Sequence, residues 1–168
     1  MPTSTYEPIA TTTLTSSQPS ITFSVIPQTY TDLVLVTQAS QTGGPTQGKL
    51  AVGNGSIDTG ANYTDTILYG NGTSALSARA NNNWWNADYL AAPGLSGAFN
   101  MAIYHFQNYS NTTTYKTVLS RSGLTSNGLE AMVHLWRSTA AINTILYGVT
   151  GGNMVAGTTA TLYGIKAA

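Results

Sequence analysis

The stretch Tyr30-Thr31-Asp32-Leu33-Val34-Leu35-Val36-Thr37 decides the fold that this sequence predicts. Its four consecutive apolar residues lie between Pro27 and the turn-forming run Gly43-Gly44-Pro45. A short apolar run bounded by turn formers is typical of a strand that is buried on both faces. Such a strand needs one layer of structure above it and another below it. The sequence therefore predicts a compact β domain organised around residues 30–37.

The neighbouring segment, residues 20–25, alternates between apolar and hydroxyl side chains. Ile21, Phe23 and Val25 share one face, which is the period-2 pattern of a strand with one face in the core. Residues 98–106 are apolar on both faces, with Met101 and Ile103 on one of them. We expect that strand to be central in a sheet or to lie at an interface.

Residues 129–136 alternate between two kinds of side chain. Four aliphatic residues occupy one face of this strand, and the other face carries Glu130, Met132, His134 and Trp136. The alternation predicts a strand.

Ten short strands are predicted in all, and no segment has a convincing helical period. They cover residues 5–14, 20–25, 30–37, 49–53, 66–69, 98–106, 115–121, 129–136, 142–148 and 158–166. Pro8 confines the first strand to a sheet edge, because proline cannot donate to a strand ladder. Turn signals every 8–12 residues favour an all-β, antiparallel β-sandwich that is jelly-roll-like. We expect one domain over residues 1–168, in which residues 1–13 can form an extended N-terminal arm.

Charge is scarce in this chain. Only 7% of the 168 residues are charged, whereas soluble domains average about 25%. Six basic and six acidic residues cancel, so the basic excess of a nucleic-acid-binding protein is missing. The 42% hydrophobic content, with ten Tyr, excludes intrinsic disorder. A neutral polar surface protects a monomer poorly from association, which favours an assembled state.

Several other classes lack their sequence signals. There is no cysteine, so neither a disulfide framework nor a thiolate metal site is expected. No apolar run approaches the roughly 20 residues of a membrane span, and residues 1–8 lack the pattern of a signal peptide. We therefore expect synthesis in a cytoplasm, no membrane partner and no cofactor.

The most suggestive local feature is the pair Trp84-Trp85, with Tyr89 nearby, among asparagines. Exposed aromatic rings beside amides can stack on a sugar ring, and exposed Trp is also enriched at protein interfaces. Neighbouring residues of a strand point to opposite faces, so at most one Trp is expected in the core and the other on the surface.

No catalytic pattern is present, so we do not expect an enzyme. His105 and His134 lack the spacing of metal ligands, which favours structural or surface roles. A Gly-x-Ser-x-Gly elbow is absent, and no pair of carboxylates stands out as an acid and base. Asp58, Asp65 and Asp88 are interpreted as turn residues in loops, and residues 58–65 lack the ligand order of a calcium loop. The five Asn-x-Ser/Thr sequons, at Asn54, Asn62, Asn71, Asn108 and Asn111, are attributed to chance in a chain rich in these residues.

Several segments, in order along nearly the whole chain, resemble a family of β-rich virion structural proteins of tailed bacteriophages and cyanophages. The resemblance is carried by residues 6–14, 20–36, 108–121, 135–142 and 156–166, the last reading Ala-Gly-Thr-Thr-Ala-Thr-Leu-Tyr-Gly-Ile-Lys. The chain departs from the family at residues 49–55, where Lys-Leu-Ala-Val-Gly-Asn-Gly replaces an Arg-Phe-Asn-Gly-Asp-like strand.

The resemblance implies a virion structural component with no catalytic residues. It implies either a capsid cement (decoration) protein on the outer capsid surface or a tail or fibre module. The first reading gives the major capsid protein and a homotrimer of this chain as partners, and the alternative gives host-surface glycans. We expect the virion as the location, after synthesis in the host bacterial cytoplasm.

Overall fold

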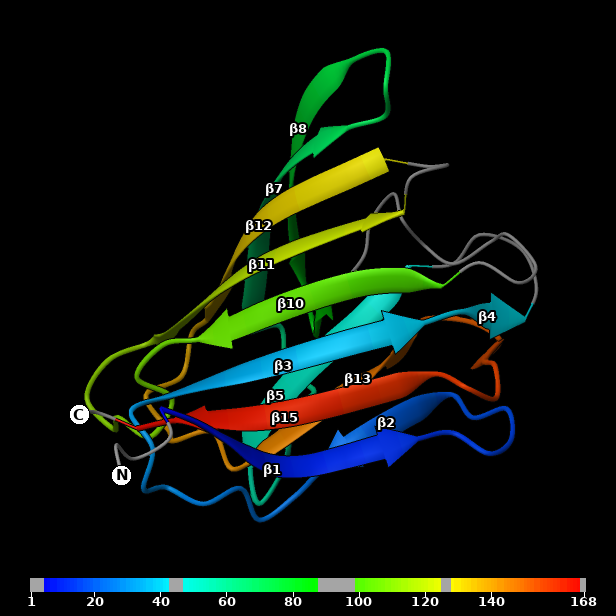
Figure 1. Ribbon diagram of the computed structural model, residues 1–168. Helices are drawn as coiled ribbons and strands as arrows, with labels where there is room; N and C mark the ends of the chain where they lie inside the picture. Colours follow the sequence, from blue (N-terminus) through cyan, green and yellow to red (C-terminus); the bar gives the residue numbers. More distant parts are fainter. Residues whose placement is uncertain (1–4, 43–46, 88–98, 125–127, 167–168) are drawn as a thin grey trace.

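The computed structural model describes residues 5–42, 47–87, 99–124 and 128–166, and all regular structure in those ranges is β-strand. Two antiparallel sheets pack face to face as a sandwich (Figure 1). The predicted all-β, antiparallel sandwich is therefore confirmed. Within the described ranges there is no helix of the length and apolarity that a membrane crossing requires.

The large sheet has eight strands, and every neighbouring pair is antiparallel. Their order across the sheet is β1 (Tyr6–Thr13), β15 (Thr159–Ile165), β3 (Asp32–Ala39), β10 (Asn100–Phe106), β11 (Lys116–Leu124), β12 (Gly128–Trp136), β7 (Tyr63–Gly70) and β8 (Ala75–Asn82).

The small sheet has the order β2 (Ser20–Phe23), β13 (Thr144–Val149), β5 (Gly48–Asn54), β6 (Ser56–Ile57), with β9 (Trp85–Asn86) paired to β5. A separate pair joins β4 (Gln41–Thr42) to β14 (Asn153–Met154). The chain crosses repeatedly between the two sheets: β1, β3 and β7 belong to the large sheet, and β2 and β5 belong to the small one. This alternation gives the sandwich its jelly-roll-like character.

The core lies between the two sheets. Leu33 and Leu35 of β3 are fully buried, as is Leu50 of β5 on the opposite layer. Burying one such side chain contributes about 1.5–3 kcal/mol. The other large core side chains that are fully buried there are Tyr63, Trp85, Tyr104, Phe106, Tyr109, Ile142, Ile145 and Tyr147.

The strand that organises the sequence is β3, in the interior of the large sheet, but the prediction that a layer covers both of its faces is wrong. The inner face packs on the small sheet. On the outer face, no other layer of the described residues covers Val34 and Val36, and their side chains line an open groove. Val36 is only half-buried, while neighbouring side chains of its own sheet bury Val34.

A second correction concerns Val25, which we expected to share a buried face with Ile21 and Phe23. Strand β2 ends at Phe23, and Val25 has a φ of +54° with 88% of its surface exposed. The left-handed backbone at Val25 turns the chain, so that Ile26 enters the core instead.

The two outermost strands of the large sheet are β1 and β8. Strand β1 pairs only with β15, which confirms the edge position predicted from Pro8. Residues 6–13 of the predicted arm are thus part of this sheet, and residues 1–4 lie outside the described ranges. Strand β8 was not predicted, because residues 75–82 contain few β-branched or aromatic side chains.

Candidate functional site: the outer face of the large sheet

Strand β12 shows which side chains the large sheet turns outward. Its buried face carries Glu130, Met132, His134 and Trp136, whereas Leu129 is 66% exposed and Val133 is 48% exposed. Polarity alone would predict the opposite orientation, because the aliphatic row is the one in water. An exposed aliphatic row of this kind is uncommon on a monomeric protein, and it makes this surface the candidate site.

Ser120, Ser122, Glu130 and His134, which lie on the inner face, form hydrogen bonds to one another. Ser120 Oγ and His134 Nε2 lie 2.7 Å apart, and Ser122 Oγ donates to Glu130 Oε2 at 3.1 Å. Burial lowers the pKa of His134 to about 3, so the imidazole is neutral at ordinary pH. These hydrogen bonds offset part of the cost of burial, whereas His134 Nδ1 is buried without a hydrogen-bond partner.

Asp65 of β7 belongs to the same buried face. Both of its carboxylate oxygens accept from the Asn86 side chain, and Oδ2 also accepts from the Asn86 backbone N–H at 3.1 Å. Desolvation raises the pKa of Asp65, and the hydrogen bonds from Asn86 oppose that rise. Its prediction as a loop residue is wrong, because Asp65 lies within a strand.

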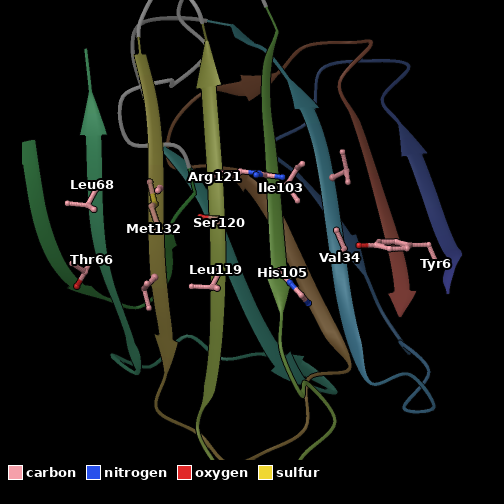
Figure 2. A pocket seen from close by; sticks show the side chains of 13 residues that line it. Tyr6, Val34, Thr66, Leu68, Ile103, His105, Leu119, Ser120, Arg121 and Met132 are labelled. Carbon is pink, nitrogen blue, oxygen red and sulfur yellow. The ribbon is translucent and has the colours of Figure 1, made fainter. Parts of the chain in front are cut away.

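The outer face is hollowed into a groove of about 770 Å³, which we call the outer-face groove (Figure 2). Two cross-strand rows of side chains form most of it. One row runs from β3 to β7 as Val34, His105, Leu119, Val133 and Thr66; the next runs as Val36, Ile103, Arg121, Ala131 and Leu68. Tyr6 of β1 closes one end.

The apolar surface continues beyond the groove toward β8. A second hollow, of about 480 Å³, lies over β7, β8 and β12 and shares Leu68 and Ala131 with the first. Leu76 and Leu129, which are 45% and 66% exposed, add to it. The two hollows form one apolar face, and contiguous apolar patches larger than a few hundred Å² are uncommon on monomers.

Two polar features interrupt this apolar face. His105 Nε2 lies 3.1 Å from Asp32 Oδ2, and the other oxygen of Asp32 accepts from the Asn108 backbone N–H at 2.7 Å. Arg121 lies in the middle of its row, between Ile103 and Ala131 in the strand register, and is exposed. In Figure 2 its nitrogens extend toward Ile103.

The predicted aromatic site lies elsewhere. Trp85 is fully buried: its Nε1 donates to the Leu135 carbonyl at 3.1 Å, and its ring packs edge-on against Tyr63 at 5.2 Å. Trp84 is half-buried against the core, with Lys49 Nζ 4.8 Å from its ring centroid. One Trp is therefore a core residue, and the structure does not bring either one to the outer-face groove. Tyr89 lies outside the described residues.

The other candidate residues have structural roles. Asp58 accepts from the Gly60 backbone N–H and from Asn62, which is the turn chemistry expected of it, and also from Trp136 Nε1 at 2.7 Å. Asp88 lies outside the described ranges. Within those ranges, no three His, Asp or Glu side chains are grouped closely enough to hold a metal ion.

The asparagines of two sequons stabilise turns through side chain-to-backbone hydrogen bonds. Asn71 Oδ1 accepts from the backbone N–H groups of Thr73 and Ser74 and from the Thr73 hydroxyl. Asn111 Oδ1 makes the corresponding bonds to Thr113 and Thr114. Asn-x-Thr spacing suits this side chain-to-backbone turn, so these two sequons have a structural reason beyond chance.

The sequence contained a signal for the groove that the site prediction did not use. Strand β10 is apolar on both faces, and β12 places Trp136 and His134 opposite an aliphatic row. Large aromatic side chains contribute most to a core, so they mark the inner face and leave the aliphatic row outside. Comparison of the chain with models of protein families gives no match, and neither does comparison with curated protein sequences.

Proposed function

We propose that this protein is a structural component of a tailed-phage virion, most specifically a capsid decoration protein that attaches to the outer capsid surface. The observation that carries the proposal is the exposed apolar face of the large sheet, because such a face is typical of a protein committed to a partner. The near absence of charge and the resemblance to phage virion proteins support it. Catalysis has no support, since the described polar clusters are buried or paired within the fold.

The size of the face limits how strongly one copy can attach. The six strands from β3 across to β8 in the order of the sheet span about 29 Å, at a spacing of about 4.8 Å between strands. Three rows of outward side chains along these strands span about 20 Å. The resulting area is on the order of 600 Å², near the roughly 800 Å² per partner of a standard interface. An area of this size does not by itself determine affinity, because association costs about 4–15 kcal/mol and the contacting side chains lose conformational freedom.

Because the face is smaller than the surface that one partner contributes to a standard interface, attachment by several linked copies would strengthen binding. A homotrimer would present three such faces at once, and the second and third contacts would form at high effective concentration. We therefore include a homotrimer in the proposal, with the major capsid protein as the partner of each face. The mechanism is non-covalent clamping of neighbouring capsid subunits.

The test is the copy number of the protein in purified virions, measured by quantitative mass spectrometry against the major capsid protein. A ratio near one to one, or one trimer for each threefold position of the shell, is the expected result. A few to a few tens of copies would instead place the protein in the tail and favour the glycan-binding alternative. Absence from purified virions would refute both readings.

A further inference from the structure

We propose that the outer-face groove binds an amphipathic segment of the capsid protein that presents a carboxylate among apolar side chains, and that this carboxylate pairs with Arg121. The inference rests on the proposed function and names the chemistry of its partner. It follows from where Arg121 lies, from the state of the acidic residues of this chain, and from the shape of the face.

The positively charged Arg121 is surrounded by apolar side chains on the outer face. Its cross-strand neighbours are Ile103 and Ala131, and Leu119 precedes it by two residues on the same face of β11. An apolar occupant of the groove would remove water from the guanidinium. A buried charge is costly unless it is paired, so an occupant that fits must bring an acceptor to this point.

The chain itself does not supply that acceptor among its described residues. Asp32 bonds to His105, Asp65 to Asn86 and Glu130 to Ser122. The remaining two, Glu7 and Asp58, bond to Lys166 and Trp136. Each described carboxylate thus already has a partner inside its own fold, and Arg121 forms no ion pair with any of them.

A second copy of this chain is a poor occupant for two reasons. In a twofold contact centred on the groove, Arg121 would face Arg121, which is repulsive, and two hollows would leave a void between them. In a head-to-tail contact, a described carboxylate of the second copy would have to be shared between Arg121 and the partner it already has in its own fold. Charge complementarity therefore favours a different protein with a free carboxylate and a convex apolar surface.

The experiment measures binding of the purified protein to virus particles assembled without it. The variants are Arg121→Glu, Arg121→Lys and, as a matched charge reversal on the small sheet, Lys49→Glu. We expect Arg121→Glu to bind at least about 30-fold more weakly, because reversal leaves an unpaired or repelled charge at a closed contact. Arg121→Lys should retain most of the affinity, and Lys49→Glu should bind like the wild type.

The outcomes separate the two proposals. If the wild-type protein does not bind the particles, the proposed function fails. If it binds and Arg121→Glu binds equally well, the inference about Arg121 fails while the function stands. Arg121 is exposed, so the variants are expected to fold, and tryptophan fluorescence checks this; Arg121→Gln replaces any variant that does not fold.

A photo-crosslinking residue in place of Leu119 identifies the occupant directly. The expected product joins β11 to a capsid segment that contains Asp or Glu between apolar residues. A crosslink to a second copy of this chain, or to a segment without a carboxylate, would overturn the proposal. The same residue in place of Tyr115, which is 56% exposed outside the groove, serves as the control.

Discussion

Mild acid should destabilise this protein through one residue, His134. Its imidazole is fully buried, lies 2.7 Å from the Ser120 hydroxyl and contacts the rings of Trp85 and Tyr104. Asp65 is its cross-strand neighbour, but the Asp65 carboxylate bonds to Asn86 instead. His134 therefore has no described carboxylate to stabilise its charged form.

The direction and size of the loss of stability follow from the pKa of His134 in the folded protein and in the unfolded chain. Burial lowers the pKa of His134 to about 3 in the folded protein, against about 6.5 in the unfolded chain. Between these values only the unfolded chain binds the proton, so stability is complete above pH 6.5 and falls as the pH drops toward 3. At 1.36 kcal/mol per pH unit, the loss from pH 7.5 to pH 5 is about 2 kcal/mol. The size of this loss depends only on the pKa of His134 in the unfolded chain, as long as its pKa in the folded protein lies well below 5.

Urea denaturation at several pH values, followed by tryptophan fluorescence, measures this loss. Trp85 and Trp136 are buried and report unfolding. The wild type and a His105→Gln control should lose about 2 kcal/mol between pH 7.5 and 5, whereas His134→Gln, which keeps a partner for Ser120 but does not titrate, should lose much less. Raising the pKa of Asp65 by burial acts in the opposite direction and cannot create the loss. Equal slopes for wild type and His134→Gln would refute the reasoning, and NMR titration of the His134 ring provides a check on the folded protein.

Three further predictions concern the fold, each measured by urea denaturation. Leu35→Ala should cost about 2–5 kcal/mol, whereas Leu129→Ala, on the outer face, should change stability by less than about 0.5 kcal/mol; similar costs would contradict the assignment of faces. Gly164→Ala should lower the free energy of unfolding by about 1–3 kcal/mol, because the new methyl group would clash with the Tyr30 ring. An unchanged urea midpoint would show that the ring can move aside. Tyr63→Phe should cost about 1–3 kcal/mol, because the buried hydroxyl donates to the Val52 and Asp58 carbonyls, and a neutral substitution would show that these bonds add nothing.

Local sequence pattern was sufficient for most of the strands. Ten of the fifteen strands in the described ranges, β1 and β3 among them, overlap the predicted ranges, because they contain β-branched or aromatic side chains. Strand β8 is the longest that was missed. Its Ala-Leu-Ser-Ala-Arg-Ala-Asn-Asn has no intrinsic strand preference, so its pairing with β7 determines its conformation.

The candidate site was predicted less well, because it depends on which face of each strand is inside. The pair Trp84-Trp85 was singled out as a candidate site because asparagines surround it in the sequence, but Trp85 is a core residue. The groove is made by residues from six strands, of which β1, β3 and β7 lie far in the sequence from the consecutive strands β10, β11 and β12. Only the sheet order brings Val36, Ile103 and Leu68 into one row. A single strand cannot reveal such a row, whatever its pattern.

The two ends of the large sheet limit how this protein can form larger assemblies. At one end Pro8 lacks an N–H for a new strand, and Glu7 and Lys166 form an ion pair at 2.6 Å. At the other end most residues of β8 are exposed, and the strand carries Arg79, a charge that discourages strand addition. Growth of a continuous sheet from molecule to molecule, the route to fibrils, is thereby hindered at both ends. Under the proposed function, many copies that each attach by the outer face could crowd on a capsid without joining into such a sheet.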